Sequence, residues 1–529
     1  FSLRPPGGWA IIESRNLCPL SAEMDAAMTS YDTLIIGSGS AGGVLAARLS
    51  EDPTHQVLLL EAGPDYTSAE ALPSDLRYGF GTPSGILSLT HDWGYSATAT
   101  PAAPPIAIPR GRVIGGSSSV NATIFLRGIP DDFARWVALG NDRWAWESVL
   151  PYYRKIEKDQ DFQDDFHGSD GPIPVGRYAE ADWPEDQRAW YAACLDAGYP
   201  ESPDMNRPGT TGVGPYPLNS RGRVRHSTAL AYLLPARGRA NLTIRGNAVV
   251  QRICFDGIRA TGVDVLIDGA AEEISAGRVI LCGGAIASPQ LLMLSGIGPA
   301  EHLRSLDIPV LLDRPGVGDG LRDHPTTGLL WRVRSDFPAN TTAHFHQVGL
   351  RYSAAGSDFF NDMIVYFGVH PVEQTLFVRP TINYALSTGT LRLTSTDVRV
   401  QPALNYGYYA HPFDRQRQRE AIRLCIKLVG TDGFAGFVRE PIQHPGQALH
   451  DDPALDHWIL RHADTGHHSS STCRMGPEAD GLSVVDQRGK VYGTEGLWVV
   501  DASILPETVR ANINATVLMM AERMADWLK

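Results

Sequence analysis

The sequence predicts an α/β protein in two parts: a doubly wound, Rossmann-like parallel sheet that binds a dinucleotide, and an α+β domain built on an antiparallel sheet. The first part is indicated by a βαβ pattern, in which apolar strands at 33–36 and 57–60 flank a helical stretch at 40–49. The second part is indicated by alternating, aromatic segments such as DMIVYFGVHP, from residue 362. A chain of 529 residues also exceeds what one hydrophobic core usually organises.

The dinucleotide-binding domain is predicted to be discontinuous. Buried strands of the same kind return late in the chain, at 278–284 and 497–503. We therefore expect residues 31–154, 226–322 and 465–529 to form the dinucleotide-binding domain, and residues 155–225 and 323–464 to form the substrate domain. Residues 1–30 lack the basic start and apolar run of a signal peptide, and we interpret them as a leader, a tag or a disordered arm.

Composition excludes several classes of partner. The net charge of −13 provides no basic stripe for nucleic acid or for an anionic membrane surface. No window has the roughly 20 unbroken apolar residues of a membrane-spanning helix. The six cysteines are scattered without a C-x-x-C pair, which indicates free thiols in a reducing, cytoplasmic setting and no structural zinc.

A glycine motif between the first strand and helix carries the dinucleotide prediction. Gly37-x-Gly39-x-x-Gly42 lets the backbone approach a pyrophosphate at the positive end of the helix, and Glu61 ends the second strand where it can accept from ribose hydroxyls. An acid there favours an unphosphorylated ribose, which leaves FAD and NAD open. The residues predicted to bind the dinucleotide here are Gly37, Gly39, Ser40, Gly42, Glu61 and Ala62.

A second loop of small residues, RGRVIGGSSSVNATIFLRG at 110–128, suits a cofactor's phosphates or a polar ring edge. A flexible linker is the alternative, but a linker would not run directly into the apolar ATIFL. The cofactor-binding residues predicted in this loop are Arg110, Val113, Gly115, Gly116, Ser117, Asn121 and Ala122.

Four motifs together resemble the glucose-methanol-choline (GMC) oxidoreductases. They are GSGSAGG, this glycine-serine loop, GGAIASPQLLMLSGIGP at 283–299 and VVDASILPETVRANINATVLMMAER near the end. Within the family, HGSDGPIPVGR and LDRPGVGDGLRDHP are most similar to bacterial 5-hydroxymethylfurfural oxidase and aryl-alcohol oxidase-like members.

The resemblance implies FAD as the cofactor. Some members attach FAD through a histidine, and this sequence has Val120 at the matching position, so we expect non-covalent binding. Ala515 and Thr516, at the start of the closing helix, are implied to face flavin N1 and the C2 carbonyl, where the helix dipole would stabilise a reduced anion. The other implied FAD contacts are Val250, Asp501 and Ala502.

The segment TGHHSSSTCRMG, at 465–476, resembles the family's catalytic histidine motif. Its register implies His468 as the base, because a neutral imidazole suits removal of a hydroxyl proton. The family's second active-site residue is implied at Asn514, with Asn512 as the rival. His467 either lines the substrate pocket or bonds the backbone. A metal site is disfavoured, because adjacent side chains on a strand point to opposite faces and no H-E-x-x-H occurs.

The predicted activity is oxidation of a primary, aromatic or heteroaromatic alcohol to an aldehyde, with hydride passing to flavin N5. Tyr366, Phe367 and Phe345 are candidate pocket walls, with core packing as the competing interpretation. The resemblance favours dioxygen as the electron acceptor. The alternatives are a dye- or quinone-linked choline-type dehydrogenase, an FAD-containing hydroxynitrile lyase and a nicotinamide dehydrogenase. A serine hydrolase is disfavoured because no G-x-S-x-G elbow is present.

Overall fold

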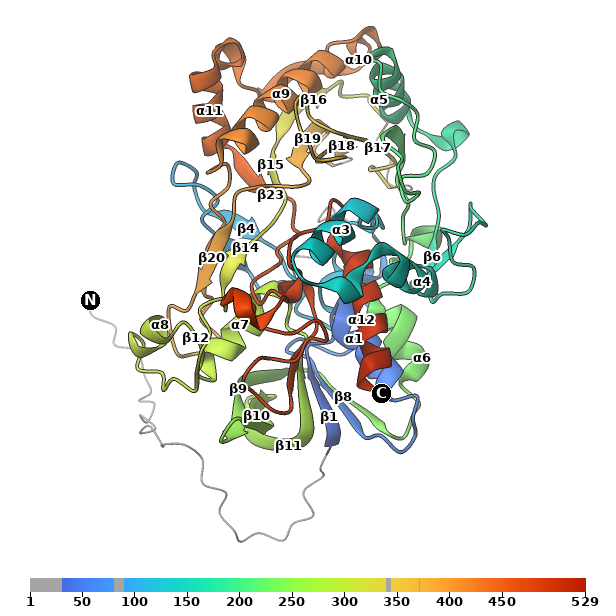
Figure 1. Cartoon of the computed structure of the whole chain (residues 1–529). Helices are drawn as coiled ribbons and strands as arrows, with labels where there is room; N and C mark the ends of the chain where they lie inside the picture. The colour runs from blue at the N-terminus through green and yellow to red at the C-terminus, as the bar shows by residue number, and fades with distance from the viewer. Residues whose placement is uncertain (1–30, 80–89, 339–343, 371) are drawn as a thin grey trace, which may run out of the picture.

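Two large sheets organise the molecule and lie at opposite ends of it (Figure 1). The computed structural model describes residues 31–79, 90–338, 344–370 and 372–529, so the predicted leader lies outside the described residues. The helices are α1 (Ser40–Leu49), α2 (Ser74–Arg77), α3 (Pro130–Ala138), α4 (Trp146–Ile156), α5 (Glu185–Asp196), α6 (Leu234–Ala236), α7 (Gly284–Leu294), α8 (Ala300–Arg304), α9 (Pro412–Val429), α10 (Asp432–Ala435), α11 (Asp452–Arg461) and α12 (Ile513–Leu528).

The lower sheet in Figure 1 has a parallel part and an antiparallel extension. Its strand order is β8-β2-β1-β11-β10-β9. A seventh strand, β24, also pairs with β11. β8, β2, β1, β11 and β24 run parallel, which confirms the doubly wound prediction, and strands from three distant stretches of the chain share this sheet. The bounds are β1 (Tyr31–Ile36), β2 (Val57–Leu60), β8 (Leu242–Arg245), β9 (Ala248–Asp256), β10 (Arg259–Ile267), β11 (Ala270–Leu281) and β24 (Leu497–Val499).

The upper sheet is antiparallel, as the alternating segments predict, and α5, α9, α10 and α11 lie around its outer side (Figure 1). Its order is β22-β16-β19-β18-β17-β7, with β15 joining β19 and β23 joining β15. The bounds are β7 (Gly212–Pro215), β15 (Pro325–Thr327), β16 (Leu329–Val333), β17 (Val348–Tyr352), β18 (Met363–His370), β19 (Thr375–Ile382), β22 (Val438–Gln443) and β23 (Ala463–Thr465).

Smaller sheets complete the fold. Another alternating segment, TGTLRLTS at 388–395, contains β20, which pairs with β14 and β21 in a three-stranded sheet separate from the large antiparallel one. The bounds are β3 (Tyr95–Ala97) with β4 (Ile106–Ile108), β5 (Glu157–Asp159) with β6 (Ile173–Val175), β12 (Ile297–Gly298) with β13 (Leu312–Asp313), and β14 (Asp319–Leu321) with β20 (Gly389–Arg392) and β21 (Ala403–Asn405).

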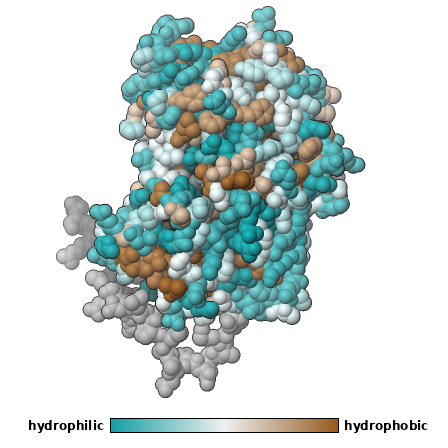
Figure 2. Space-filling view, viewed as in Figure 1, coloured by the Kyte–Doolittle hydropathy of each residue, from teal (hydrophilic) through white to brown (hydrophobic). Residues whose placement is uncertain are grey.

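The face shown in Figure 2 is mainly hydrophilic, with hydrophobic residues in separate patches. Among the described helices, none combines the length and the apolar character needed to cross a bilayer. The cysteines Cys194, Cys254, Cys282, Cys425 and Cys473 are free thiols.

The buried carboxylate of Glu522 fixes the position of α12 against α1, the helix that follows β1. Glu522 is fully buried and accepts from Arg48 of α1 and from the Tyr232 hydroxyl, and Lys155 of α4 pairs with it at 2.9 Å. Because removal of one partner of a buried charge pair is strongly destabilising, these contacts hold α12 in one axial position. The start of α12 is thereby fixed at the centre of the molecule.

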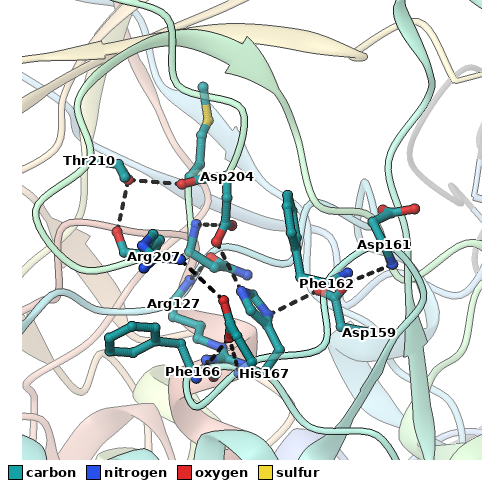
Figure 3. A network of polar contacts seen from close by, with 12 residues as sticks. Arg127, Asp159, Asp161, Phe162, Phe166, His167, Asp204, Arg207 and Thr210 are labelled. Carbon is teal, nitrogen blue, oxygen red and sulfur yellow. Dashed lines mark hydrogen bonds and ion pairs between the residues drawn. The ribbon is translucent and has the colours of Figure 1, made fainter.

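A second buried charge cluster surrounds His167 and includes Arg127, near the end of the glycine-serine loop (Figure 3). The ring of His167 lies between carboxylates: Nδ1 is 3.1 Å from oxygens of both Glu157 and Asp159, and Nε2 is 2.9 Å from Asp204. Arg127 pairs with Glu157, while Arg177 pairs with Asp159 and Asp204 at 3.0 Å. These six side chains are at most 5% exposed.

This geometry makes His167 an imidazolium. Both ring nitrogens face carboxylate oxygens, so both must donate. Burial opposes the charge, but hydrogen bonds to Asp159, Asp204 and Glu157 outweigh it and raise the pKa of His167 to about 11. The three carboxylates are then balanced by two guanidiniums and one imidazolium. Glu157, Asp159 and His167 also have metal-ligand chemistry, but an imidazolium has no free lone pair for an ion.

His167→Gln is predicted to lower the free energy of unfolding by about 3 kcal/mol, because it leaves buried carboxylates short of one compensating charge. The folded-state pKa of about 11 lies above the ordinary 6.5, so this stabilisation is fully present below pH 6.5 and is lost as pH rises toward 11. Urea unfolding at several pH values measures it. The exposed His457→Gln is the control. A wild-type advantage that grows with pH would contradict the imidazolium.

Candidate functional site

One cavity of about 610 Å³ connects the two motifs that the sequence singled out. At one end it is lined by the glycine turn, including Gly37, Gly39 and Ser40, and at the other by His467 and His468. The predicted cofactor residues among its lining are Gly37, Gly39, Ser40, Glu61, Ala62, Arg110, Gly116, Ser117, Asn121, Ala122, Val250, Asp501 and Ala502. The chain therefore brings the predicted cofactor residues and the predicted base to a single site.

The glycine turn has the geometry that a pyrophosphate requires. Gly37 has φ +97, where a side chain would be strained and a Cβ would lie 2.6 Å from the Cys282 carbonyl oxygen. Gly39 is the N-cap of α1 and no side chain caps this helix end, so the first N–H groups of α1 remain available beside the cavity.

Glu61 connects the glycine turn to the glycine-serine loop. Its carboxylate accepts from the N–H and the hydroxyl of Ser38, at 3.0 and 2.6 Å, and from the Gly63 N–H at 3.0 Å. The Ser38 hydroxyl also accepts from the Gly115 N–H at 3.0 Å. Burial raises the pKa of Glu61, whereas these bonds lower it. A carboxylate has about four acceptor positions, so one remains for a ribose hydroxyl.

The two glycine motifs meet through their backbones. Gly116 has φ +52, and a Cβ added there would lie 2.7 Å from the Gly39 Cα. Ser118 and Ser119 bond the loop's own carbonyls, while Ser117 lines the cavity. Uncapped helix N–H groups, close-packed glycines and a carboxylate with spare acceptor capacity fit a dinucleotide.

Five predicted cofactor residues do not line the cavity, and their contact with the cofactor stays a prediction. Gly42 and Gly115 shape the turns instead: a Cβ on Gly42 would lie 1.8 Å from the Gly37 carbonyl oxygen, and Gly115 has φ +84. Val113 is buried, and its carbonyl accepts from the Gly116 N–H. Ala515 and Thr516 are buried on another face of α12, whose Ile513, Asn514 and Val517 line the cavity.

The histidine segment is held by a buried aspartate. One Asp323 oxygen accepts from the His468 N–H at 2.7 Å, and the other accepts from the hydroxyls of Thr465 and Tyr408. His467 has φ +69, so the chain bends there. This bend brings both His467 and His468 to the cavity. An extended strand, as expected from the sequence, would point the two side chains to opposite faces. Arg110 ties the segment to the glycine-serine loop through Ser469, at 2.6 Å.

A chain of hydrogen bonds fixes where the protons on His468 lie. His324 Nε2 is 3.0 Å from the Val509 carbonyl oxygen, so it carries the hydrogen and donates. His324 Nδ1 must then accept, and it lies 2.9 Å from His468 Nδ1, which donates. His468 Nε2 is therefore left without a hydrogen. His324 was not predicted from the sequence, although it lies in the GLRDHP motif that supports the family resemblance.

His468 is also kept neutral. Burial, followed by the charges of His324, His467 and Arg110, lowers its pKa well below the usual 6.5. His468 is 8% exposed, and that exposure is toward the cavity. A neutral imidazole with a bare Nε2 at a cavity wall has the features of a general base.

Asn512, and not Asn514, is the partner of His468, which corrects the predicted pairing. Asn512 Nδ2 lies 3.1 Å from His468 Nε2, and its Oδ1 accepts from the Tyr366 hydroxyl at 3.3 Å. Asn514 lies two residues further along, in the first turn of α12, and its Oδ1 accepts from the Ser40 hydroxyl at 2.7 Å. Both residues line the cavity, but their side chains bond different groups.

Two of the predicted pocket residues are neighbours on β18 and therefore point to opposite faces of the sheet. Tyr366 lines the cavity, but Phe367, its neighbour on β18, points to the opposite face and stacks on Trp190 at 4.7 Å. Phe367 therefore packs in the core, the competing interpretation, and does not line the cavity. Phe345 is buried against His346 and Phe377. His467 lines the cavity, and its Nδ1 has no hydrogen-bond partner among the described residues.

Comparison with known proteins agrees with this geometry. Two family models, each described as GMC oxidoreductase, match residues 31–326 and 385–521. The chain belongs to the GMC oxidoreductase family. This GMC oxidoreductase is accordingly an FAD-dependent enzyme that acts on alcohols, and the cavity's glycine end fits that cofactor.

Several relatives cover nearly the whole GMC chain. An uncharacterised GMC-type oxidoreductase of Rhodococcus erythropolis is 39% identical and covers 93% of this chain and 97% of its own. Mitochondrial choline dehydrogenase of Mus musculus is 36% identical, and the match covers 99% of this chain and 94% of that protein. Pyridoxine 4-oxidase from Mesorbium loti superposes with a TM-score of 0.87 at 32% identity, covering 94% and 99%. A fungal aryl-alcohol oxidase, at 22% identity and a TM-score of 0.82, shares the fold.

Asn512→Ala is predicted to slow alcohol-dependent flavin reduction by about 10²-fold, because it removes the donor beside His468 Nε2. Asn514→Ala is predicted to change that rate by less than about 5-fold, because its side chain bonds Ser40. Stopped-flow reduction under anaerobic conditions measures both variants. The reverse order of effects would restore Asn514 as the partner.

His324→Leu is predicted to slow flavin reduction by about 10²-fold, because His468 Nδ1 loses its acceptor and the ring's proton is no longer directed. His324→Gln offers one acceptor and one donor on the same side chain and should recover most of the rate. Loss of His324 also removes one contribution that lowers the pKa of His468, so the acid limb of the Leu variant should move toward neutral pH. Equal rates in both variants with an unchanged pH profile would contradict this role.

Proposed function

We propose that this GMC oxidoreductase oxidises a primary, aromatic or heteroaromatic alcohol to an aldehyde, with His468 as the base and dioxygen as the final electron acceptor. The observation that supports it best is the bare Nε2 of a neutral His468 beside the Asn512 amide, in the same cavity as the dinucleotide residues. FAD, when bound, supplies a hydride acceptor at N5. The residue roles follow from the chain's own contacts.

The substrate hydroxyl would contact both His468 and Asn512, replacing the direct 3.1 Å hydrogen bond between Asn512 Nδ2 and His468 Nε2. Asn512 Nδ2 donates to the hydroxyl oxygen, while His468 Nε2 accepts the hydroxyl proton. Tyr366 holds the Asn512 amide in this orientation through its Oδ1. As His468 becomes an imidazolium, its Nδ1–H continues to donate to His324, so the proton stays on Nε2 until the product leaves.

The start of α12 assists the same site. Asn512 is the N-cap of α12, but its side chain bonds His468 rather than the helix, so the first-turn N–H groups lack a side-chain cap. These groups and the helix dipole favour negative charge at the cavity. Val120, at the position of the family's covalent histidine, cannot form a link to FAD, and we infer that the cofactor is bound without one.

The walls of the cavity support an aromatic substrate. Trp93 and Tyr95 line it and stack at 5.7 Å, and Tyr366 lines the side near His468. The similarity to pyridoxine 4-oxidase and to an aryl-alcohol oxidase is consistent with an aromatic alcohol, and the motifs named above are consistent with a furanic one.

A choline-type activity is the second candidate, because choline dehydrogenases of several organisms are 36% identical to this chain. The cavity disfavours it. Its lining carboxylates are Glu61 and Asp501, and both are engaged by neighbouring N–H and hydroxyl groups near the glycine turn. A quaternary ammonium would therefore meet Arg379 and histidines rather than an acid on the substrate side.

The direct test is anaerobic bleaching of the flavin band by a panel of alcohols. His468→Ala is predicted to slow bleaching by about 10²–10⁴-fold, and His467→Ala to do much less. Because the pKa of His468 is depressed, the base form persists as pH falls, and the wild-type rate should stay level from pH 8 to below 6.5. A normal rate in His468→Ala would contradict the assignment.

Admission of air to the reduced enzyme then tests the acceptor. An oxidase returns to the oxidised spectrum and releases hydrogen peroxide in proportion to the aldehyde, whereas a dehydrogenase does so only with a dye or quinone. A hydroxynitrile lyase would leave the flavin oxidised throughout. Acid precipitation releases the yellow colour to the supernatant if FAD is bound without a covalent link.

A further inference from the structure

The substrate side of the cavity, where it meets the antiparallel sheet, is polar and carries positive charge. The sheet contributes Tyr366 and His370 from β18, Arg379 and Thr381 from β19, and Thr326 from β15. Arg379 is the cation of this group. Tyr366, Thr326 and Thr381 already bond protein groups, so the unused donors of Arg379 are the groups that an aryl alcohol with no other polar substituent would leave without a partner.

Arg379 is held in place and still has donors to offer. Its Nη2 donates to Asp464 Oδ2 at 2.5 Å and to the Thr465 carbonyl at 3.3 Å. Among the described residues, Nε and Nη1 have no hydrogen-bond partner, and the Arg379 side chain is 29% exposed. Asp464 is outside the cavity lining, and its side chain is 43% exposed, so water screens its charge. Because only Nη2 is engaged, Nε and Nη1 of Arg379 can donate to a second carboxylate.

The position of Arg379 relative to the base is set by strand pairing. Arg379 on β19 lies directly across from Tyr366 on β18. The Tyr366 hydroxyl contacts Asn512, which contacts His468. Arg379 is therefore one strand, about 4.8 Å, beyond the residue that orients the catalytic amide. A single aromatic ring with substituents on opposite sides can span from the base to this guanidinium.

The charge around the cavity points the same way. Arg110 also lines it, and no ion pair to Arg110 occurs within the described part of the chain. His467 lies near both guanidiniums: burial and then the charges of Arg379 and Arg110 lower its pKa to about 4, so it is neutral near pH 7 and the two arginines supply the positive charge. The field in this part of the cavity favours an anion and disfavours a cation.

We propose that the substrate carries a carboxylate at the end remote from the reacting hydroxyl, and that Arg379 binds this group and selects for it. This inference rests on the proposed alcohol oxidation and narrows its substrate to ring-bearing hydroxymethyl acids. Arg379 has no part in moving the proton or the hydride, so it is a specificity residue rather than a catalytic one. It acts on binding more than on the rate at saturation.

Three matched alcohols test the proposal with the wild-type holoenzyme. They are 4-(hydroxymethyl)benzoate, its uncharged amide 4-(hydroxymethyl)benzamide, and the cation 4-(hydroxymethyl)phenyltrimethylammonium. Anaerobic stopped-flow gives the Kd and the limiting reduction rate separately for each. The carboxylate is expected to bind at least about 10-fold more tightly than the amide, with the cation weakest, because a charged hydrogen-bonded pair is worth that factor or more.

Arg379→Gln should raise the Kd of the carboxylate by about 10–100-fold and that of the amide by less than about 3-fold, with limiting rates little changed. Arg379→Lys, which keeps the charge but loses the fork, should fall between Gln and wild type. Arg332→Gln is the matched control: it removes an arginine from the adjacent strand β16 whose side chain is 57% exposed and paired with Glu440.

Equal Kd values for the three alcohols in the wild type would overturn the proposal even if Arg379 variants failed to fold. An equal loss of amide and carboxylate binding in Arg379→Gln would also overturn it, because that pattern indicates a structural role. Failure of all three alcohols, and of a wider alcohol panel, to bleach the flavin would instead overturn the proposed function. The two failures are therefore distinguishable.

Discussion

The site depends on the direction of one hydrogen-bonded chain. The Val509 carbonyl can only accept, and this fixes the hydrogen of His324 on Nε2, which in turn makes His324 Nδ1 an acceptor and His468 Nδ1 a donor. Every later role of His468 follows from that order, because a base needs its lone pair on the nitrogen that faces the substrate. The Val509 carbonyl, which has no pKa near neutrality, thus determines the tautomer of His468 through two hydrogen bonds.

The same centre holds together segments that are far apart in sequence. The glycine turn contacts the glycine-serine loop through Gly39 and Gly116, that loop contacts the histidine segment through Arg110 and Ser469, and Ser40 bonds Asn514 of the closing helix. These contacts are short and mostly polar, so the cofactor residues and the catalytic residues cannot shift independently. A cavity assembled in this way needs every segment in place before it can bind anything.

Much of this could be predicted from the sequence, and the failures have physical reasons. The βαβ pattern and the glycine spacing identify the dinucleotide end, because local geometry there depends on residues close in the chain. The motif implied Asn514 rather than Asn512 as the partner of His468, because a motif gives only an approximate register. The choice between pocket and core for Phe367 stayed open, because it depends on which face of β18 is covered. His324 and Arg379 reach the site through pairing between distant strands, and one sequence does not specify that pairing. The bend at His467 depends on Thr465 and Asp323, which is likewise a tertiary effect.

The uncapped start of α12 has a consequence for how this enzyme tolerates change. Asparagine is among the best N-cap residues, yet Asn512 gives its amide to His468 and Tyr366 and leaves the helix end unsupported. Helix stability and catalysis therefore compete for one side chain. Selection for thermal tolerance alone would favour Ser or Asp at this position, so a more stable descendant of this protein would be expected to lose its activity at residue 512 first.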